Sequence, residues 1–367
     1  MSAAGGCEGP QRQRDRTVEG ARVWSCALPT PTPPTPRVWR VIEQLWARVD
    51  ADRSHAGPIL SEGLRAARTL GSKERPVAGD VLTGLIRHSR ALARIDADPL
   101  AAWRRLCEEG VPELDDPPDA YAIATSVPDD LAAEWWERLG PDAAVAHART
   151  LAGRAPVALR VLREPVDLPV PHRRVGPRAI VLEGRANLHV LDAFRDGHVE
   201  VQDLGSQRIV DAAFEGLGPG ARVLDLCAGA GGKSLALAAL GARVDAWDVR
   251  PQALRELSRR AERAGLRIRV GPPRERYDLV LVDAPCSGTG VLRRHPENRW
   301  KLRYPTDTQA ALLRDALRLA PRVVYATCSL ALRENEQLVR SVAGAPAREE
   351  TLWPGDSEGF YWAEVRG

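Results

Sequence analysis

From Ala221 onward, short runs of apolar, often β-branched residues alternate with segments of helical periodicity. The apolar runs read ARVLDL, ARVDAWDV, YDLVLVDA and RVVYATC. The helical patterns between and after them cover Gly232–Leu240, Gln252–Ala264 and Thr308–Leu319. This alternation predicts a doubly wound, mainly parallel sheet, because parallel neighbours need a crossover connection. Such a sheet binds ligands at the carboxyl ends of its strands, so chemistry is expected where these runs end.

The N-terminal part of the sequence has two regions of different character. Residues 1–36 include the run PTPTPPTP and predict a flexible, extended tail. Residues 37–115 predict an all-helical domain, since apolar residues such as Val38 and Ile42 recur at helical spacing. Asp80 precedes a second helical pattern, so we expect it to cap that helix.

A linker and a mixed region follow. The stretch 111–127 is acidic, contains prolines and predicts a linker. Residues 128–205 predict a small α+β subdomain, and residues 206–367 make up the predicted α/β domain. The helical patterns of the subdomain are Asp130–Leu139 and Asp142–Leu151, and its strand-like runs are Val157–Val161, Ala179–Leu182 and Val199–Gln202. The predicted fold class is therefore a Rossmann-like α/β domain preceded by α+β and all-helical regions.

Composition places the chain among ordinary globular proteins. Of its 367 residues, 44% are hydrophobic and 28% are charged. No apolar run approaches the roughly 18 residues that a membrane helix needs. No apolar segment precedes Cys7, which argues against a lipoprotein signal peptide. We therefore expect a cytoplasmic, monomeric protein that does not contact a membrane.

Six cysteines are spread widely along the chain, and no two of them form a CxxC pair. They are Cys7, Cys26, Cys107, Cys227, Cys286 and Cys328. This spacing predicts no zinc site or other metal site, and it indicates free thiols in a reducing compartment.

Charge is unevenly distributed, although the net charge is only +3. Residues 250–340 carry 19 Lys and Arg against 10 Asp and Glu, whereas residues 100–150 carry 4 against 11. The basic part can attract phosphate backbones, which makes RNA a candidate partner. A solvated, arginine-rich surface would give the same counts, so charge alone does not show whether the protein binds RNA.

A glycine-rich segment, DLCAGAGGKS, runs from Asp225 to Ser234 after the first apolar run. Its glycines let the backbone approach a ligand, and the helix start offers free N–H groups. The segment does not match the phosphate-binding motif GxxxxGK[ST], because Cys227 stands where the first glycine is required. It does not match the dinucleotide-binding motif GxGxxG either, because Ser234 stands at the position of the third glycine. S-adenosylmethionine is the third candidate ligand, and a purely structural turn is the alternative. The residues expected to hold the cofactor here are Cys227, Ala228, Gly229, Ala230, Gly231, Gly232 and Lys233.

Three further strand ends carry chemically useful residues. Asp248 ends the next run, where an acid can bind both ribose hydroxyls of a nucleoside cofactor, although a surface acid is the alternative. Asp283 opens the turn DAPCSGTG, which contains Cys286, and Cys328 ends the last run in YATCS. A lone cysteine is usually a small buried hydrophobe. Two cysteines that end parallel strands beside a cofactor turn favour a catalytic reading.

Together these motifs resemble those of the bacterial ribosomal RNA cytosine-carbon-5 methyltransferase family (the Sun or Fmu family, with nucleolar relatives in eukaryotes). The resemblance is strong from about residue 195 to 367. Upstream it is weaker, and residues 37–110 are similar to the family's antitermination-factor-like RNA-binding domain. Further matching segments are VQDLGSQ at 201–207, RRHP at 293–296, ENEQ at 334–337 and EGFY at 358–361.

The resemblance implies S-adenosylmethionine as cofactor, RNA as partner with 16S rRNA foremost, and covalent catalysis on cytosine. Cys328 is then the thiol that attacks carbon 6, and Cys286 assists release of the methylated base. Asp283 bonds the base and contacts the cofactor, while Lys233 closes the cofactor turn. The target cytosine has to leave its stack to reach the cysteines.

Other functions stay open at this point. Transfer RNA is an alternative substrate for the same chemistry. An inactive RNA-binding ribosome-assembly factor is another, because Ala230 replaces the usual proline of the turn and Gly271 stands near the place of the usual acid beside the adenine. A dinucleotide-dependent oxidoreductase is disfavoured, since no catalytic His, Tyr or Lys constellation follows the sheet.

Overall fold

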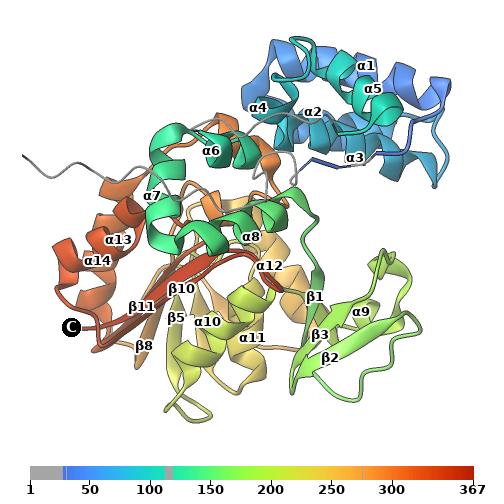
Figure 1. Cartoon of the computed structure of the whole chain (residues 1–367). Coiled ribbons are helices and arrows are strands. Elements are labelled where there is room, and N and C mark those ends of the chain that lie inside the picture. The colour runs from blue at the N-terminus through green and yellow to red at the C-terminus, as the bar shows by residue number, and fades with distance from the viewer. Residues whose placement is uncertain (1–27, 30, 112–118, 275) are drawn as a thin grey trace, which may run out of the picture.

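The computed structural model describes residues 28–367, except residues 30, 112–118 and 275. Figure 1 shows helices at the N-terminal end, a small sheet to one side and a larger α/β body. The predicted fold class is confirmed. Most of the predicted tail, 1–36, lies outside the described residues. The prediction is wrong at the end of this segment, because Leu28 is buried in the core of the N-terminal helices.

The N-terminal helices pack around apolar side chains at helical spacing, as the sequence predicts. Their bounds are α1 Pro36–Ala51, η2 Arg53–His55, α2 Ala56–Ala66, α3 Glu74–Arg87, α4 Ser89–Leu92 and α5 Pro99–Glu109. Thr35 caps α1 by accepting a hydrogen bond from the Val38 N–H. The prediction that Asp80 caps a helix is wrong, because Asp80 lies inside α3 and its carboxylate accepts a hydrogen bond from Arg185.

Three helices connect the N-terminal region to the rest of the chain. They are α6 Ala120–Thr125, α7 Asp129–Leu139 and α8 Pro141–Ala152. The linker prediction for 111–127 is wrong where α6 lies, because this helix is buried throughout; residues 112–118 lie outside the described part. The same hydrophobic cluster contains side chains of α1, α7 and α8, together with Leu292 and Leu330 of the α/β body.

The small sheet has the strand order β2-β3-β1-β4 and is antiparallel throughout. Its strands are β1 Val157–Val161, β2 His172–Gly176, β3 Ala179–Leu182 and β4 Val199–Val201, with η3 Leu188–Val190 and α9 Asp192–Arg195 before β4. The sequence predicts β1, β3 and β4 but not β2. That edge strand reads HRRVG and has no apolar alternation, because four of its five residues are exposed.

The large sheet has the order β10-β11-β9-β8-β5-β6-β7. Its strands are β5 Arg222–Asp225, β6 Arg243–Ala246, β7 Ile268–Val270, β8 Leu279–Asp283, β9 Arg322–Thr327, β10 Arg348–Leu352 and β11 Phe360–Arg366. Strands β5 to β9 pair in parallel, whereas β11 is antiparallel to both β9 and β10. The direction of winding reverses on either side of β5, which makes the carboxyl end of β5 the switch point where ligands bind.

Helices cover both faces of the large sheet (Figure 1). They are α10 Leu204–Phe214, α11 Gly232–Ala239, α12 Pro251–Ala264, α13 Thr306–Leu319 and α14 Glu336–Ala343. Helices α10 and α11 pack on one face, with α12 beside α11, and α13 and α14 pack on the other. Short helical turns lie in the loops at η4 Thr289–Val291, η5 Pro296–Trp300 and η6 Leu332–Glu334.

Two further properties bear on function. Among the described residues, no helix is both long and apolar enough to cross a membrane. In the same part of the chain, no three His, Cys, Asp or Glu side chains gather in a way that could hold a metal ion.

Candidate active site

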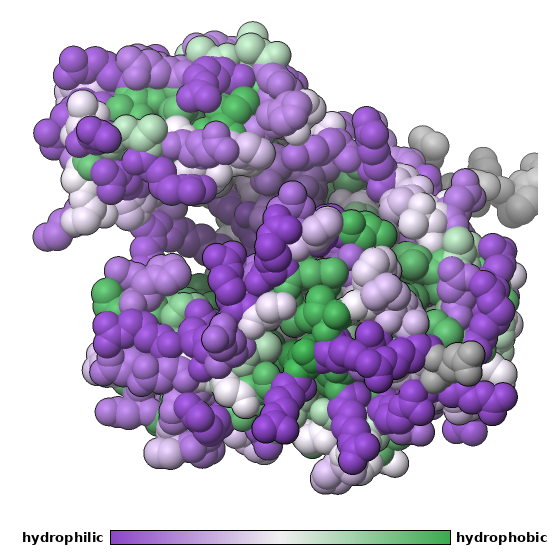
Figure 2. All heavy atoms as spheres, turned by 180° about the vertical axis from the view of Figure 1, so that it is seen from behind, coloured by the Kyte–Doolittle hydropathy of each residue, from purple (hydrophilic) through white to green (hydrophobic). Residues whose placement is uncertain are grey.

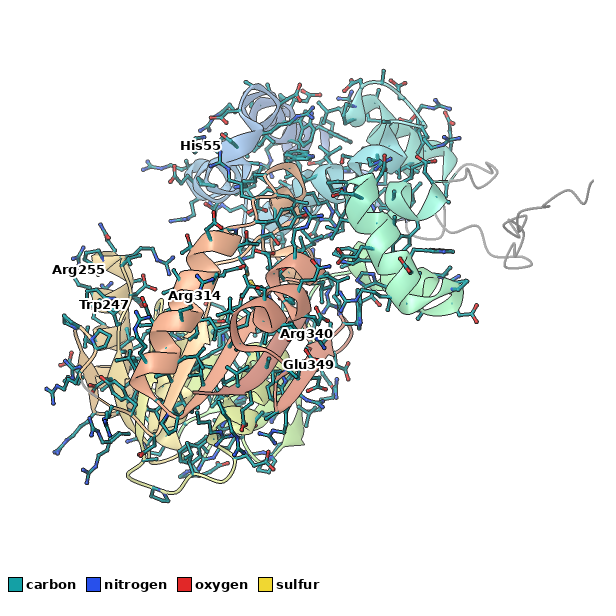
Figure 3. The ribbon with its side chains drawn as sticks, turned by 90° about the vertical axis from the view of Figure 1, so that its left-hand side faces the viewer. His55, Trp247, Arg255, Arg314, Arg340 and Glu349 are labelled. Carbon is teal, nitrogen blue, oxygen red and sulfur yellow. The ribbon has the colours of Figure 1, made fainter. Side chains whose placement is uncertain are left out.

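The carboxyl ends of β5, β6, β7 and β8 meet at one edge of the large sheet, where a cavity of about 760 Å³ opens. Helix α13 closes its other side. The lining residues are Leu226, Cys227, Trp247, Asp248, Val249, Arg250, Pro273, Asp283, Pro285, Cys286, Thr308, Leu312, Asp315, Arg318 and Leu319. Figure 3 shows Trp247 and Arg255 on this side of the molecule, with Arg314 of α13 nearby in the view. Cys227, Asp248, Asp283 and Cys286 thus share one cavity.

The turn between β5 and α11 has the backbone that its glycines predict. Gly229 and Gly231 have φ angles of +51° and +88°, in the left-handed region that favours glycine. A Cβ on Gly231 would lie 2.5 Å from Cγ of Leu257 in α12, so this glycine is also required by packing. Gly232 begins α11, and no atom lies within 4 Å of the place where its Cβ would be. The turn is therefore open beside the first turn of the helix.

Asp248 is buried at the end of β6 and is held firmly in place. Its Oδ2 accepts the Gly229 N–H at 2.8 Å, and its Oδ1 accepts the Arg250 N–H at 2.9 Å. The Arg250 guanidinium also lies across the carboxylate, with its Nε 2.9 Å from Oδ1. Burial acts to raise the pKa of Asp248, but the bonds from Arg250 and Gly229 outweigh it, so the pKa lies below its ordinary value. Asp248 is therefore ionised and fixed beside the glycine turn.

Lys233 and Asp283 form an ion pair between α11 and the end of β8, with Nζ 2.6 Å from Oδ2. The Lys233 side chain is only 9% exposed, whereas that of Asp283 is 34% exposed. Burial acts to lower the pKa of Lys233, but Asp283 and the neighbouring Asp225 more than offset it, so the pKa is raised. A charged ammonium is thus held at the bottom of the site, and Asp283 keeps its other oxygen for a ligand.

The thiols of Cys286 and Cys328 share a hydrogen bond, with 3.3 Å between their Sγ atoms. They come from the turns after β8 and β9, which are adjacent parallel strands. The hydrogen bond with Cys328, burial and the Glu334 carboxylate together raise the pKa of Cys286 well above its ordinary value. The Cys286 thiol is accordingly held in its protonated form.

Comparison with known proteins finds a family that part of this chain resembles. Residues 216–351 match the protein family described as 16S rRNA methyltransferase RsmB/F. We refer to the matched segment, residues 216–351, as the RsmB/F region.

Curated proteins similar to this chain carry a related name. The protein named ribosomal RNA small subunit methyltransferase B from Citrobacter koseri is 34% identical over 223 residues, which are 52% of this chain and 52% of that protein. The protein of the same name from Salmonella arizonae is also 34% identical, over 224 residues and the same shares. The aligned part of the chain therefore spans about half the length of these relatives.

Solved structures extend the likeness in fold beyond the RsmB/F region. The crystal structure of PH0851 has a TM-score of 0.73 and 19% identity, and it covers 92% of this chain and all of that one. A methyltransferase homologue from Pyrococcus horikoshii has a TM-score of 0.58 and 21% identity, and it covers 68% of this chain and 99% of that one. At these identities the likeness concerns the fold.

The predicted site residues of the RsmB/F region fall into two groups. Cys227, Asp248, Asp283 and Cys286 line the cavity. Cys328 is not part of the lining, but its thiol is hydrogen-bonded to that of Cys286. The remaining turn residues, Ala228 to Gly232, are not part of the cavity lining, although Gly229 donates to Asp248, and Lys233 bonds the lining residue Asp283. Burial raises the pKa of the Cys227 thiol steeply, so this thiol is held in its protonated form.

Four polar residues at the site were not predicted as site residues from the sequence. Arg250 covers Asp248, and Gln309 of α13 donates to the Pro285 carbonyl at 2.8 Å. Glu334 and Asn335 lie below the two cysteine turns. The signal was present in the segment ENEQ, where two adjacent polar residues are fully buried, but burial of polar side chains cannot be read from polarity alone.

Proposed function

We propose that this chain is an S-adenosylmethionine-dependent RNA methyltransferase that methylates carbon 5 of a cytosine in 16S rRNA. One observation carries the proposal: two thiols lie 3.3 Å apart, and one of them, Cys286, lines a cavity together with Asp248 and with Asp283, the ion-pair partner of Lys233. Two cysteines fit a reaction that needs one thiol to bond the base and another group to assist release. The names of the relatives support RNA of the small ribosomal subunit as the substrate.

The cavity suits a nucleoside cofactor with a methionine end. Asp248 offers a carboxylate at the position that binds ribose hydroxyls in this architecture. The open space beside Gly232 and the first N–H groups of α11 suit a carboxylate or another polar end of a ligand. When bound, S-adenosylmethionine supplies an electrophilic methyl group on a sulfonium sulfur.

The protein's own residues then have separate tasks. The Cys328 sulfur adds to carbon 6 of the ring, forming an S–C6 bond and moving an electron pair towards carbon 5, which is otherwise a weak nucleophile. Asp283 accepts a hydrogen bond from the base, and Lys233 holds Asp283 in position. After carbon 5 has gained its methyl group it gives its proton to water, and the electron pair of that C–H bond restores the C5–C6 double bond. The S–C6 bond breaks at the same time and returns its electron pair to the Cys328 sulfur, which takes up a proton. Cys286, kept as a thiol, assists this last step.

RNA would reach the cavity from the side below the N-terminal helices. Seen from behind, the surface is hollowed beneath those helices (Figure 2). Exposed arginines on α12 and α13, among them Arg255 and Arg314, lie on the same side of the molecule as Trp247 (Figure 3). Such side chains suit phosphate contacts, and a cytosine would have to unstack to reach the thiols. We also propose that the protein works as a monomer in the cytoplasm, where this RNA is found.

The proposal is tested by methyl transfer from labelled S-adenosylmethionine. We expect label in unmodified 16S rRNA and none in duplex DNA, and bisulfite sequencing should find a single protected cytosine. Label in transfer RNA alone would overturn the choice of substrate. Binding of the cofactor and RNA without any transfer would identify an inactive RNA-binding protein instead.

A further inference from the structure

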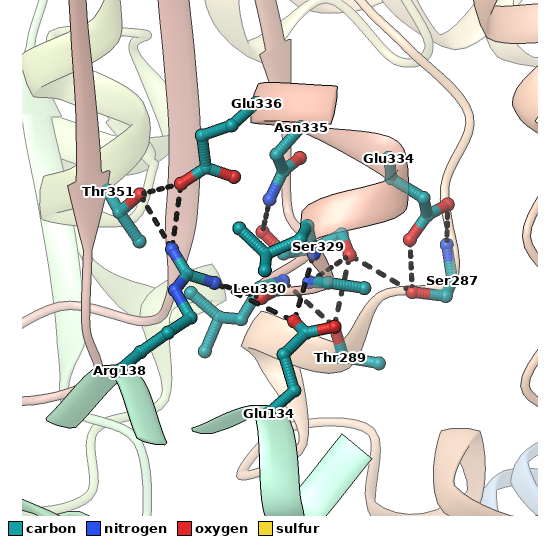
Figure 4. A network of polar contacts seen from close by, with 12 residues as sticks. Glu134, Arg138, Ser287, Thr289, Ser329, Leu330, Glu334, Asn335, Glu336 and Thr351 are labelled. Atoms are coloured by element: carbon teal, nitrogen blue, oxygen red, sulfur yellow. Dashed lines mark hydrogen bonds and ion pairs between the residues drawn. The ribbon is translucent and has the colours of Figure 1, made fainter. Parts of the chain in front are cut away.

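Each of the two cysteines is flanked by residues whose hydrogen bonds end on one short segment, Glu334–Asn335 (Figure 4). This segment joins η6 to α14, and both of its side chains are fully buried. Neither residue is among those that line the cavity. Their contacts show how the protein fixes the separation of two thiols that come from different strands.

Glu334 and Gln309 bracket Cys286. Glu334 accepts the Ser287 N–H at 2.9 Å through Oε1 and the Ser287 hydroxyl at 2.5 Å through Oε2. The Gln309 amide donates to Glu334 Oε1 at 3.0 Å and to the Pro285 carbonyl at 2.8 Å. The residues before and after Cys286 are thereby tied to one buried carboxylate, whose hydrogen-bond partners here are all neutral.

Asn335 brackets Cys328 in the same way. Its Oδ1 accepts the Thr327 hydroxyl at 2.7 Å, and its Nδ2 donates to the Ser329 carbonyl at 2.9 Å. The two turns are also tied to each other, because the Ser329 hydroxyl lies 3.2 Å from that of Ser287. A side-chain amide that donates and accepts on either side of Cys328 leaves its turn little freedom.

We propose that Glu334 and Asn335 are positioning residues, which hold Cys286 and Cys328 respectively at the separation that the reaction needs, and that the Glu334 charge keeps Cys286 in the role of the protonated thiol. The inference rests on the proposed function, which defines the roles of the two thiols in attack and release. Adjacent residues in one rigid segment can fix two turns together, because neither can move without the other.

The Glu334 carboxylate contacts only one of the two cysteine turns. Its carboxylate binds the turn that contains Cys286 and not the turn that contains Cys328. A buried negative charge disfavours a second one close by, so it opposes a thiolate at Cys286. Among the described residues, other titratable groups near the thiol pair include Tyr325 of β9 and Lys233, whose ammonium is paired with Asp283.

The experiment measures each thiol separately in the full chain without RNA. Alkylation by iodoacetamide is followed by mass spectrometry of the two cysteine peptides across a pH series. Glu334→Gln keeps an acceptor for Ser287 but removes the charge, so the midpoint for Cys286 should fall by about one pH unit. Glu336→Gln is the matched control, because Glu336 binds Arg138 and Thr351 and no residue of the cysteine turns. It should leave the midpoint unchanged.

A second readout uses RNA and single turnovers. Asn335→Ala should slow formation of the covalent adduct by about 10- to 100-fold, because small misplacement of a nucleophile is costly. Glu334→Gln should instead slow release, so that adduct accumulates. Gln309→Met, which keeps the charge but loses the bond to Pro285, should slow release without lowering the Cys286 midpoint.

The outcomes separate the two proposals. An unchanged Cys286 midpoint in a folded Glu334→Gln protein, or an equal shift in Glu336→Gln, overturns the role of the Glu334 charge. An unchanged release rate in Gln309→Met overturns the positioning role, also where Glu334→Gln does not fold. A shifted midpoint in a protein whose wild type methylates no RNA would sink the proposed function while leaving the thiol arrangement as inferred.

Discussion

The thiols of Cys286 and Cys328 differ in their surroundings, although only 3.3 Å separates them. If Cys328 bonds carbon 6 and Cys286 assists release, Cys286→Ala should attack and methylate once and then stay attached to its RNA. On a denaturing gel this variant should give a slow band that ribonuclease removes. Cys328→Ala should give no such band and should not transfer methyl groups. A band from Cys328→Ala instead would show that the two cysteines have the opposite roles. If both variants are mildly destabilised and neither is trapped on RNA, both cysteines are core residues without a catalytic role.

Asp248 offers a second prediction at the level of one side chain. Asp248→Ala should weaken binding of S-adenosylmethionine by about 1–3 kcal/mol, the usual cost of losing a hydrogen bond to a charged group. Isothermal titration gives this difference directly. Because Asp248 also holds the Gly229 N–H, Asp248→Asn is the control that keeps an acceptor for the turn. Wild-type affinity in Asp248→Ala would mean that another residue holds the ribose.

The elements that build the site were largely predictable because their own residues specify them. Strands such as β5 and β8 are short, largely buried and contain β-branched valines. The turn after β5 needs positive φ angles, and its sequence has glycines at those positions. The order of strands and helices then brings Asp248, Asp283 and the cysteines to one edge. The sequence could therefore indicate which strand ends meet.

Elements whose formation depends on distant partners were not predictable in this way. Strand β2 forms an exposed edge by pairing with β3, and β10 reads REETL yet pairs with β11. Helix α6 is buried by neighbours despite its acidic flank. The hydrogen bonds of Glu334 and Asn335 likewise exist only once turns from two strands have met. In each case tertiary contacts override local preference.

The junction of β5 and α11 predicts a dependence of stability on pH. Asp225 is fully buried and accepts the Ser234 hydroxyl at 2.6 Å, and burial raises its pKa from 3.8 to about 7. The folded protein therefore holds this proton more tightly, so the associated stability is full below about pH 4 and is lost as the pH rises through about 7. Asp225→Asn cannot titrate, so its free energy of unfolding should fall less over this range. Urea denaturation at several pH values measures this, and parallel curves would contradict it.

Across the whole molecule, one loop connects the cysteine turn with the N-terminal helices. Asn298 of η5 approaches the Gly288 carbonyl at 3.4 Å, at the end of the turn that contains Cys286. Two residues later, Trp300 packs edge-on against Trp46 of α1, with 6.3 Å between ring centroids. Lys301 then donates to the Ser54 carbonyl at 3.1 Å. The position of the N-terminal helices is thus coupled through a few residues to the shape of the active site.

Trp300→Ala tests this coupling. Removing the ring opens a gap between α1 and η5 and removes the partner over which the Arg53 guanidinium lies, 5.1 Å from the ring centroid. Because Trp300 is only partly buried, the free energy of unfolding should fall by about 2 kcal/mol, less than the ~3–5 kcal/mol typical of a core tryptophan. Hydrogen exchange should rise in η2 and in the Cys286 turn, since both lose the packing that joins them.

Trp39→Ala supplies the matched control for that experiment. Trp39 lies in α1, the helix that contains Trp46. Like Trp300, it packs against an arginine, with the Arg104 Cζ 4.7 Å from its ring. This arginine belongs to α5, so the contact stays within the N-terminal helices. It should lower stability without raising exchange in the Cys286 turn. If both variants loosen that turn equally, the effect reflects loss of stability in general. If Trp300→Ala raises exchange in η2 alone, the N-terminal helices and the active site move independently, and the coupling through η5 does not exist.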